Sequence, residues 1–285
     1  MITIYKPNLN IKAGLFLFVL LSSVPVFSQP LKCTVLSRET NSWIGFVNIG
    51  IVGKNIGTVS DEFGNFMINL DNIYDNDSIR FSMIGYESKS FLVSHLKEDF
   101  KEDSIIKTYL TPKNYTLPEI KVIYRKPKII RLGNPVISND LRSGFESNDL
   151  GSELGIKTKV KGRVVLKDIN LNVAICTFDS VTYRLNIYQS VNQTAYKNIL
   201  TKPIYISFTK DKINNVISFD LSKYSITVDG DVLIALELYK DLGEGKLLFL
   251  TQFFTGTTYH RKTSKGNWSE ASGVIGMYLH GQLLR

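Results

Sequence analysis

The sequence has few of the residues from which catalytic and metal sites are usually built. It contains only two cysteines, Cys33 and Cys176, and three histidines. Two cysteines are too few for a disulfide framework. They leave two alternatives: a single bridge between domains in an oxidising compartment, or two separately buried thiols. Nothing in the sequence points to a Ser-His-Asp arrangement.

Sequence motifs for common chemistries are also missing. There is no GxGxxG or GxxxxGK[ST] phosphate loop and no GxSxG. SxxK occurs at 104–107 and 207–210, but without the companion motifs of serine acylases. His95 and Glu98 form an HxxE pair like that of zinc carboxypeptidases, but they lie in a short connector between expected strands. We therefore predict no catalytic residue, no metal and no cofactor.

Long apolar runs are lacking beyond the beginning of the chain. Lys6 and Lys12 precede the apolar run at 15–27, and small residues suited to cleavage follow. This pattern predicts a secretory signal peptide over residues 1–28, with an uncleaved anchor as the alternative. The run is too short to span a bilayer as a helix. The expected location is the periplasm or the cell surface of a Gram-negative bacterium, associated with the outer membrane.

What the sequence does contain favours strands and a folded interior. Hydrophobic residues make up 44% and charged residues 21%, with 14 Tyr and 16 Phe. The formal net charge is +8, two units of which belong to the predicted signal peptide. So mild an excess does not require a nucleic-acid partner, because envelope surfaces are also anionic. We expect no nucleic-acid partner and a peripheral association with the outer membrane.

Residues 29–112 show short alternating segments separated by turn residues. No helical period lies between these segments, so the pattern predicts a small antiparallel β-sandwich. Within it, Gly53 and Gly57 permit a bend, and DEFGN at 61–65 has the composition of a turn. We predict a hairpin over 53–70 rather than a phosphate cradle or a cation loop.

This region resembles a known domain family. The motif runs from Trp43 through GTVSDEFGNF at 57–66 and ends with FSMIGY at 81–86. It is similar to the carboxypeptidase regulatory-like domain, a prealbumin-like β-sandwich also found at the N-terminus of TonB-dependent receptors of the bacterial outer membrane. The resemblance covers about residues 31–112. It implies an accessory or interaction module of the cell envelope and no peptidase activity. Cys33 departs from it, standing where such domains usually carry glycine.

Residues 113–150 change to a basic, Pro-containing composition, which predicts a linker. Its basic stretch includes Arg125, Lys126 and Lys128. These side chains are candidates for contact with an anionic surface, and the alternative is a solvated connector.

Residues 151–285 return to the strand pattern and predict a second, larger β-sandwich of jelly-roll kind. Val181, Tyr183, Leu185 and Ile187 alternate with more polar residues, and Asp229-Gly230-Asp231 has the composition of a hairpin turn. Aromatic residues in this region are candidates for a sugar-binding face. Trp268, in a loop rich in small residues, and Tyr188 are the positions we select.

Together these observations predict an exported, all-β, two-domain envelope protein without catalytic activity. Its expected role is that of an accessory or interaction module that binds an envelope protein or a surface glycan. Two alternatives remain open: a hydrolase whose site is dispersed over the second sandwich, and a structural component of a surface or secretion assembly.

Overall fold

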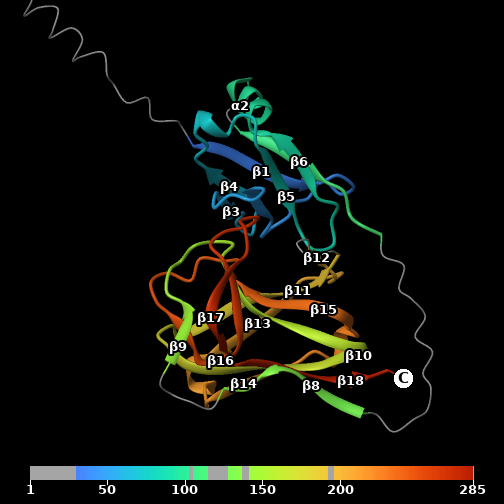
Figure 1. Ribbon diagram of the computed structural model, residues 1–285. Coiled ribbons are helices and arrows are strands. Elements are labelled where there is room, and N and C mark those ends of the chain that lie inside the picture. Colours follow the sequence, from blue (N-terminus) through green and yellow to red (C-terminus); the bar gives the residue numbers. More distant parts are fainter. Residues whose placement is uncertain (1–29, 103–104, 115–127, 137–140, 192–195, 285) are drawn as a thin grey trace, which may run out of the picture.

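The computed structural model describes residues 30–102, 105–114, 128–136, 141–191 and 196–284. The described chain forms a small N-terminal domain and a larger C-terminal domain, placed one above the other in Figure 1. The predicted all-β class is confirmed, because strands dominate both domains. The predicted signal peptide lies outside the described residues. None of the described helices has both the length and the apolar character needed to cross a membrane.

The small domain is a sandwich of two sheets around one core. One sheet has the order β4-β1-β7 and the other β3-β2-β5-β6. Alternate residues such as Ile49, Phe66 and Phe81 bury their side chains between the sheets. The strands are β1 (Leu31–Ser37), β2 (Asn48–Ile51), β3 (Gly57–Val59), β4 (Asn65–Ile68), β5 (Ser78–Ser82), β6 (Lys89–Leu92) and β7 (Ile106–Leu110). The sandwich is not wholly antiparallel, since β1 and β7 run parallel.

The turn at 61–65 forms as expected, but the hairpin prediction is wrong. The Oδ1 atom of Asp61 accepts hydrogen bonds from the backbone amides of Phe63 and Asn65, at 2.9 and 2.8 Å. Gly64 has φ +75°, which glycine adopts without strain. However, β3 pairs with β2 and β4 pairs with β1, so the turn carries the chain from one sheet to the other. Asp61 thus stabilises the backbone of the turn.

The connector expected after residue 93 is instead a helix, α2 (Val93–Glu102). Val93 and Leu96 lie one helical turn apart and are buried in the core of the small domain. This apolar pair, at a spacing that places both side chains on one helix face, is the reason the segment docks as a helix.

The larger domain folds one continuous 11-stranded sheet around a main core, with a smaller apolar cluster around Tyr188, Leu233 and Ala235. Its path is β12-β11-β15-β10-β16-β17, with the remaining strands attached to it. The central strands are β10 (Glu153–Cys176), β11 (Ser180–Ser190), β15 (Thr227–Glu237) and β16 (Leu247–Arg261). The others are β8 (Lys128–Asn134), β9 (Leu141–Phe145), β12 (Tyr196–Asn198), β13 (Ile204–Thr209), β14 (Val216–Asp220), β17 (Ser269–Ile275) and β18 (Met277–Leu283).

Strand β10 makes this sheet continuous, whereas a jelly roll is expected to have two separate sheets. Its first residues pair with β15 and β16, its middle residues pair with β14 and β18, and its last residues pair with β16 again. A bulge between Val160 and Val164 marks the change, and Gly162 within it has φ +82°. The hairpin expected at Asp229-Gly230-Asp231 is wrong, because β15 runs through these residues.

The predicted linker boundary of 113–150 is also wrong at its C-terminal side. Strand β8 pairs with β18, and β9 pairs with β16, so both are part of the larger sheet. Apolar residues within these strands, such as Leu132 and Phe145, are buried in the core of the larger domain. The basic composition of the stretch concealed these two short edge segments. Among the described residues, the larger domain therefore begins at Lys128.

The two thiols are free and buried in different domains, as one of the two alternatives expected. Cys33 lies in the core of the small domain and Cys176 in that of the larger domain. Burial raises the pKa of both thiols, and that of Cys33 rises to about 12. Neither thiol is activated as a nucleophile.

Candidate functional site

Four charged side chains stand in a row where the larger sheet faces the small domain. Arg184 on β11 pairs in register with Glu237 on β15, which pairs with Glu153 on β10, which pairs with Arg261 on β16. Cross-strand partners in an antiparallel sheet project to the same face. All four side chains are buried, with 8% or less exposed. The row places two carboxylates side by side between two guanidinium groups.

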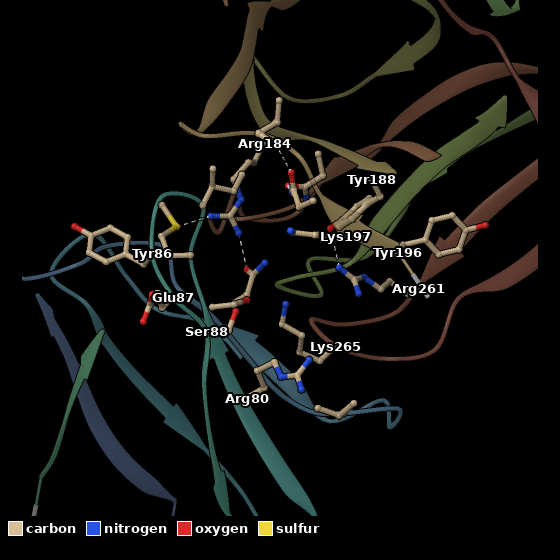
Figure 2. A pocket seen from close by; sticks show the side chains of 18 of the residues that line it. Arg80, Tyr86, Glu87, Ser88, Arg184, Tyr188, Tyr196, Lys197, Arg261 and Lys265 are labelled. Atoms are coloured by element: carbon tan, nitrogen blue, oxygen red, sulfur yellow. Dashed lines mark hydrogen bonds between the residues drawn. The ribbon is translucent and has the colours of Figure 1, made fainter. Parts of the chain in front are cut away.

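Arg184 connects the two domains. Its Nε and Nη2 atoms donate to the two carboxylate oxygens of Glu237, at 2.9 and 2.8 Å. The same guanidinium donates across the junction to the backbone carbonyl of Phe46, at 2.7 Å, and to Oδ1 of Asn48, at 2.5 Å. The guanidinium of this bidentate ion pair is thus shared with acceptors of the small domain. Dashed lines in Figure 2 mark its contacts with the sulfur of Met83, at 3.3 Å, and with Asn48.

Arg261 and Tyr188 both bind the carboxylate of Glu153. Arg261 forms an ion pair with it, and the hydroxyl of Tyr188 donates to both carboxylate oxygens, at 3.0 and 2.9 Å. The ring of Trp268 lies 4.7 Å from the Arg261 guanidinium and meets the Tyr188 ring edge-on at 5.9 Å between centroids. A cation–π contact of this kind orients the guanidinium and the indole together.

The two neighbouring carboxylates differ in proton affinity. Burial raises the pKa of Glu153, and repulsion from Glu237 adds to this rise against the opposing charge of Arg261. Burial acts on Glu237 in the same direction, but the charge and hydrogen bonds of Arg184, with a hydrogen bond from Asn186, hold its pKa below the ordinary value. The stronger partner set therefore keeps Glu237 ionised.

The loop at 262–268, between β16 and β17, presses against the small domain. The backbone amide of Gly53 donates to the carbonyl of Lys265, and Nδ2 of Asn267 donates to the carbonyl of Gly53, both at 2.9 Å. A Cβ atom added at Gly50 would lie 2.1 Å from the carbonyl oxygen of Ser264. Glycine is required there because the two backbones approach so closely. Phe46 also meets Tyr239 edge-on across the junction, at 4.9 Å.

A cavity of about 690 Å³ opens between the domains beside this row. Its volume falls in the range of small-molecule sites, and sites of this kind often form at domain junctions. The small domain contributes Arg80, Tyr86, Glu87, Ser88 and Lys113, among others, to its lining. The larger domain contributes Tyr188, Tyr196, Lys197, Arg261, Lys265 and Trp268.

The lining is strongly cationic. It includes six basic residues and a single acidic one, Glu87; the basic residues are Arg80, Lys113, Arg184, Lys197, Arg261 and Lys265. Arg184 and Arg261 are neutralised by their buried carboxylates. Within the described part of the chain, no carboxylate forms an ion pair with Arg80, Lys197 or Lys265. In Figure 2 the ends of the Arg80, Lys265 and Arg261 side chains lie toward the same space.

The pKa of Lys265 is lowered by its burial in this cationic environment. Burial and then the charge of Arg261 lower its pKa to about 8, with a smaller effect of Arg80 in the same direction. Glu153 and Glu237 oppose the shift but are already paired. The cavity thus brings Lys265 into the field of other cations, and its nearest carboxylates already form ion pairs.

Of the residues selected from the sequence, the structure brings two together. Trp268 and Tyr188 are in contact and line the cavity, but Tyr188 is not an exposed surface ring, since only 8% of it is accessible. Trp268 is half-buried rather than exposed on its loop. Lys128 lies elsewhere, as the exposed first residue of β8, and is not part of the cavity lining. Arg125 and Lys126 fall outside the described residues.

Sequence reasoning missed the buried charges and the basic residues of the cavity. A signal was present for Glu237, which lies within the otherwise apolar run at 232–239, whereas Arg184 stands among the polar residues that alternate along β11. A lone charge within such a run indicates a paired buried ion. Nothing in the local sequence marks Lys265 or Arg80, which come together only through the docking of the two domains.

A metal centre finds no support in the described part of the chain. No group of three or more His, Cys, Asp or Glu side chains there is arranged to hold an ion. His95 and Glu98 lie on α2, in the small domain, away from the cavity.

An exposed apolar group lies on the small domain. Trp43 and Phe63 meet edge-on at 5.6 Å between ring centroids, and 64% and 49% of these residues is exposed. Met67 on β4 is likewise exposed. The group is a surface feature distinct from the cavity.

The observed architecture is that of an all-β protein with a small sandwich joined to a larger sheet domain. Residues 31–122 match the family model of the CarboxypepD_reg-like domain, so the chain carries such a domain at its N-terminal side. The match confirms the resemblance found in the sequence and extends ten residues beyond the predicted boundary of 112. Domains of this family are regulatory and non-catalytic. No curated protein matches the chain.

Proposed function

We propose that this protein is an exported, non-catalytic interaction module of the bacterial cell envelope, and that it binds its partner at the junction of its two domains. The observation that carries the proposal is the cavity of about 690 Å³, which is assembled from both domains and lined by basic and aromatic side chains. Such convergent polar groups around a concave site are typical of ligand recognition. The CarboxypepD_reg-like domain supports a non-catalytic role.

In this proposal the buried ion pairs at the junction have a structural role and take no part in chemistry. Glu153 and Glu237 are each held by an arginine, and both are almost fully shielded from the cavity. A general acid or base must reach the proton that it transfers. The two carboxylates instead fix the positions of Arg184 and Arg261, which form part of the cavity wall.

The test is site-specific photo-crosslinking in cells, followed by identification of the captured envelope component. A photo-reactive residue at Ser88, which is exposed and lines the cavity, is expected to capture a reproducible partner or glycan. The same residue at Lys223, which is exposed on the larger domain and does not line the cavity, is the matched control. Equal capture from both positions, or none from either, contradicts binding at the junction.

A hydrolase is the second candidate function, favoured by one observation. Groups with shifted pKa values gather at the cavity, namely Glu153, Tyr188 and Lys265. Lys265 is the one of these three that is not tied up by a side-chain hydrogen bond among the described residues, and its pKa of about 8 suits a general base. Hydrolysis of a glycoside or ester panel by the protein, abolished in Lys265→Met, would favour this function over simple binding.

A further inference from the structure

Basic residues from both domains line the cavity, and their charges indicate which kind of ligand it binds. Arg80 comes from β5 of the small domain, whereas Lys265 comes from the loop at 262–268 and Lys197 from β12. Docking of the domains therefore brings the positive charge of Arg80 to the same cavity as those of Lys197 and Lys265. An anion bound among such like charges relieves their mutual repulsion.

The groups around Lys265 define where an anion would sit. Arg261 on β16 and Arg80 on β5 act on its ammonium as like charges, whereas Glu153 on β10 and Glu237 on β15 act as opposite charges. Both carboxylates are already engaged by Arg261 and Arg184. Arg80 and Lys265 are therefore two cationic groups of the lining that have no carboxylate partner among the described residues.

The rest of the lining suits a sugar. Trp268 and Tyr196 are half-buried and line the cavity, and the guanidinium of Arg261 packs over the ring of Trp268. Aromatic rings pack well on ligands that combine an apolar face with polar edges, as a pyranose does. Asn198 and Asn267 add amide groups to the same wall.

We propose that the junction cavity binds an acidic saccharide, with its carboxylate or phosphate between Arg80 and Lys265 and its ring against Trp268 and Tyr196. The proposal rests on the proposed function, because it names the ligand class of the same site. A protein partner is disfavoured as the occupant of this cavity. Stable protein interfaces bury about 800 Å² per partner, whereas this site is a concave space of small-molecule size.

Isothermal titration calorimetry with two matched pairs of probes tests the proposal. The first pair is trigalacturonic acid and its methyl ester, and the second is glucose 6-phosphate and glucose. We expect at least one acidic probe to bind about tenfold more tightly than its neutral counterpart, since a charged group gains charge-assisted hydrogen bonds. The pair that shows the difference identifies a carboxylate or a phosphate as the recognised group.

Variants of the full chain locate the site. Lys265→Met and Arg80→Met are each expected to weaken binding of the acidic probe about tenfold, whereas Lys265→Arg keeps most of the affinity. Lys223→Met is the control, because Lys223 is exposed and does not line the cavity. Circular dichroism of each variant separates loss of binding from loss of folding.

The outcomes distinguish this proposal from the broader one. Equal affinity for acidic and neutral probes overturns the acidic ligand, while a binding role for the module stands. Failure of both acidic probes to bind at millimolar concentration, together with capture of a protein at Ser88, also overturns it and leaves the proposed function intact. If no probe binds and no partner is captured at Ser88, both the acidic ligand and the proposed binding role are contradicted.

Discussion

At the scale of single residues, Lys265 reports most directly on the electrostatics of the junction. Its ammonium lies beside Arg261 and Arg80 in the folded protein, and its pKa falls to about 8 from an ordinary value of 10.5. The unfolded chain therefore binds more protons than the folded one between these two values. The cost of keeping Lys265 charged is fully present below about pH 8 and is relieved as the pH rises toward 10.5.

We expect the free energy of unfolding to rise by about 1 kcal/mol between pH 7 and pH 9 because of this residue. Lys265→Met removes the titrating group, so the variant is expected to be more stable than the wild type at pH 7 and to lack this rise. Urea denaturation at several pH values measures the effect. The same slope in Lys265→Met as in the wild type would show that another group is responsible.

Alternation of apolar and polar residues in the sequence predicts only part of which side chains are buried. The pattern at 181–188 correctly separates an inner face, with Tyr183, Leu185 and Ile187 in the core, from an outer face. It could not reveal that Arg184 and Tyr188 on the outer face are buried as well. The small domain covers Arg184, whereas Arg261 and Trp268 of the larger domain contact Tyr188. No local pattern records neighbours so distant in sequence.

At the scale of elements, the junction depends on how closely the loop at 262–268 approaches β2. A Cβ atom at Gly50 would lie 2.1 Å from the backbone oxygen of Ser264, and backbone cannot yield as a flexible side chain can. The close approach allows the backbone contact between Gly53 and Lys265, and so positions the lysine at the cavity. The loop and the strand therefore form one structural unit.

Gly50→Ala is accordingly expected to lower the free energy of unfolding by about 1 to 3 kcal/mol, as overpacking does. It should also weaken any binding at the cavity, because Lys265 shifts with its loop. Gly256→Ala is a suitable control, since a Cβ atom there comes no closer than 3.3 Å to Val274. Guanidinium denaturation measures both variants, and equal stability would contradict the close packing described for Gly50.

Element boundaries show a second limit of sequence reasoning. The segment at 93–102 is a helix because Val93 and Leu96 dock on the sandwich, although a connector was predicted. The turn at 61–65 was correctly predicted from Asp61 and Gly64, but its flanking strands belong to different sheets. Turn chemistry is local, whereas strand pairing is decided between distant segments.

At the scale of the whole molecule, Arg184 makes the two domains one unit. It donates to Glu237 within the larger domain and to Phe46 and Asn48 of the small domain. Removing one member of a buried ion pair leaves an uncompensated charge, which costs about 3 to 5 kcal/mol. Replacing both members by apolar residues avoids that cost, but the hydrogen bonds across the junction are still lost.

We therefore expect differential scanning calorimetry to show one cooperative transition for the wild type and a large loss of stability for Arg184→Met. The double variant Arg184→Met with Glu237→Leu should regain most of the stability of the larger domain. Its small domain should then unfold in a separate, earlier transition. Arg163→Met, at an exposed position in the β10 bulge, is the control. A single transition in the double variant would show that other contacts suffice to couple the domains.

The sequence by itself determined the all-β class, the CarboxypepD_reg-like domain, the turn at Asp61 and the apolar faces of the strands. These features depend on residues that are near one another along the chain. Only the tertiary structure decided that β8 and β9 join the larger sheet, that four charges line up across it, and that Arg80 and Lys265 line the same cavity. Those arrangements depend on the register of distant strands and on the docking of two domains, which no local periodicity encodes.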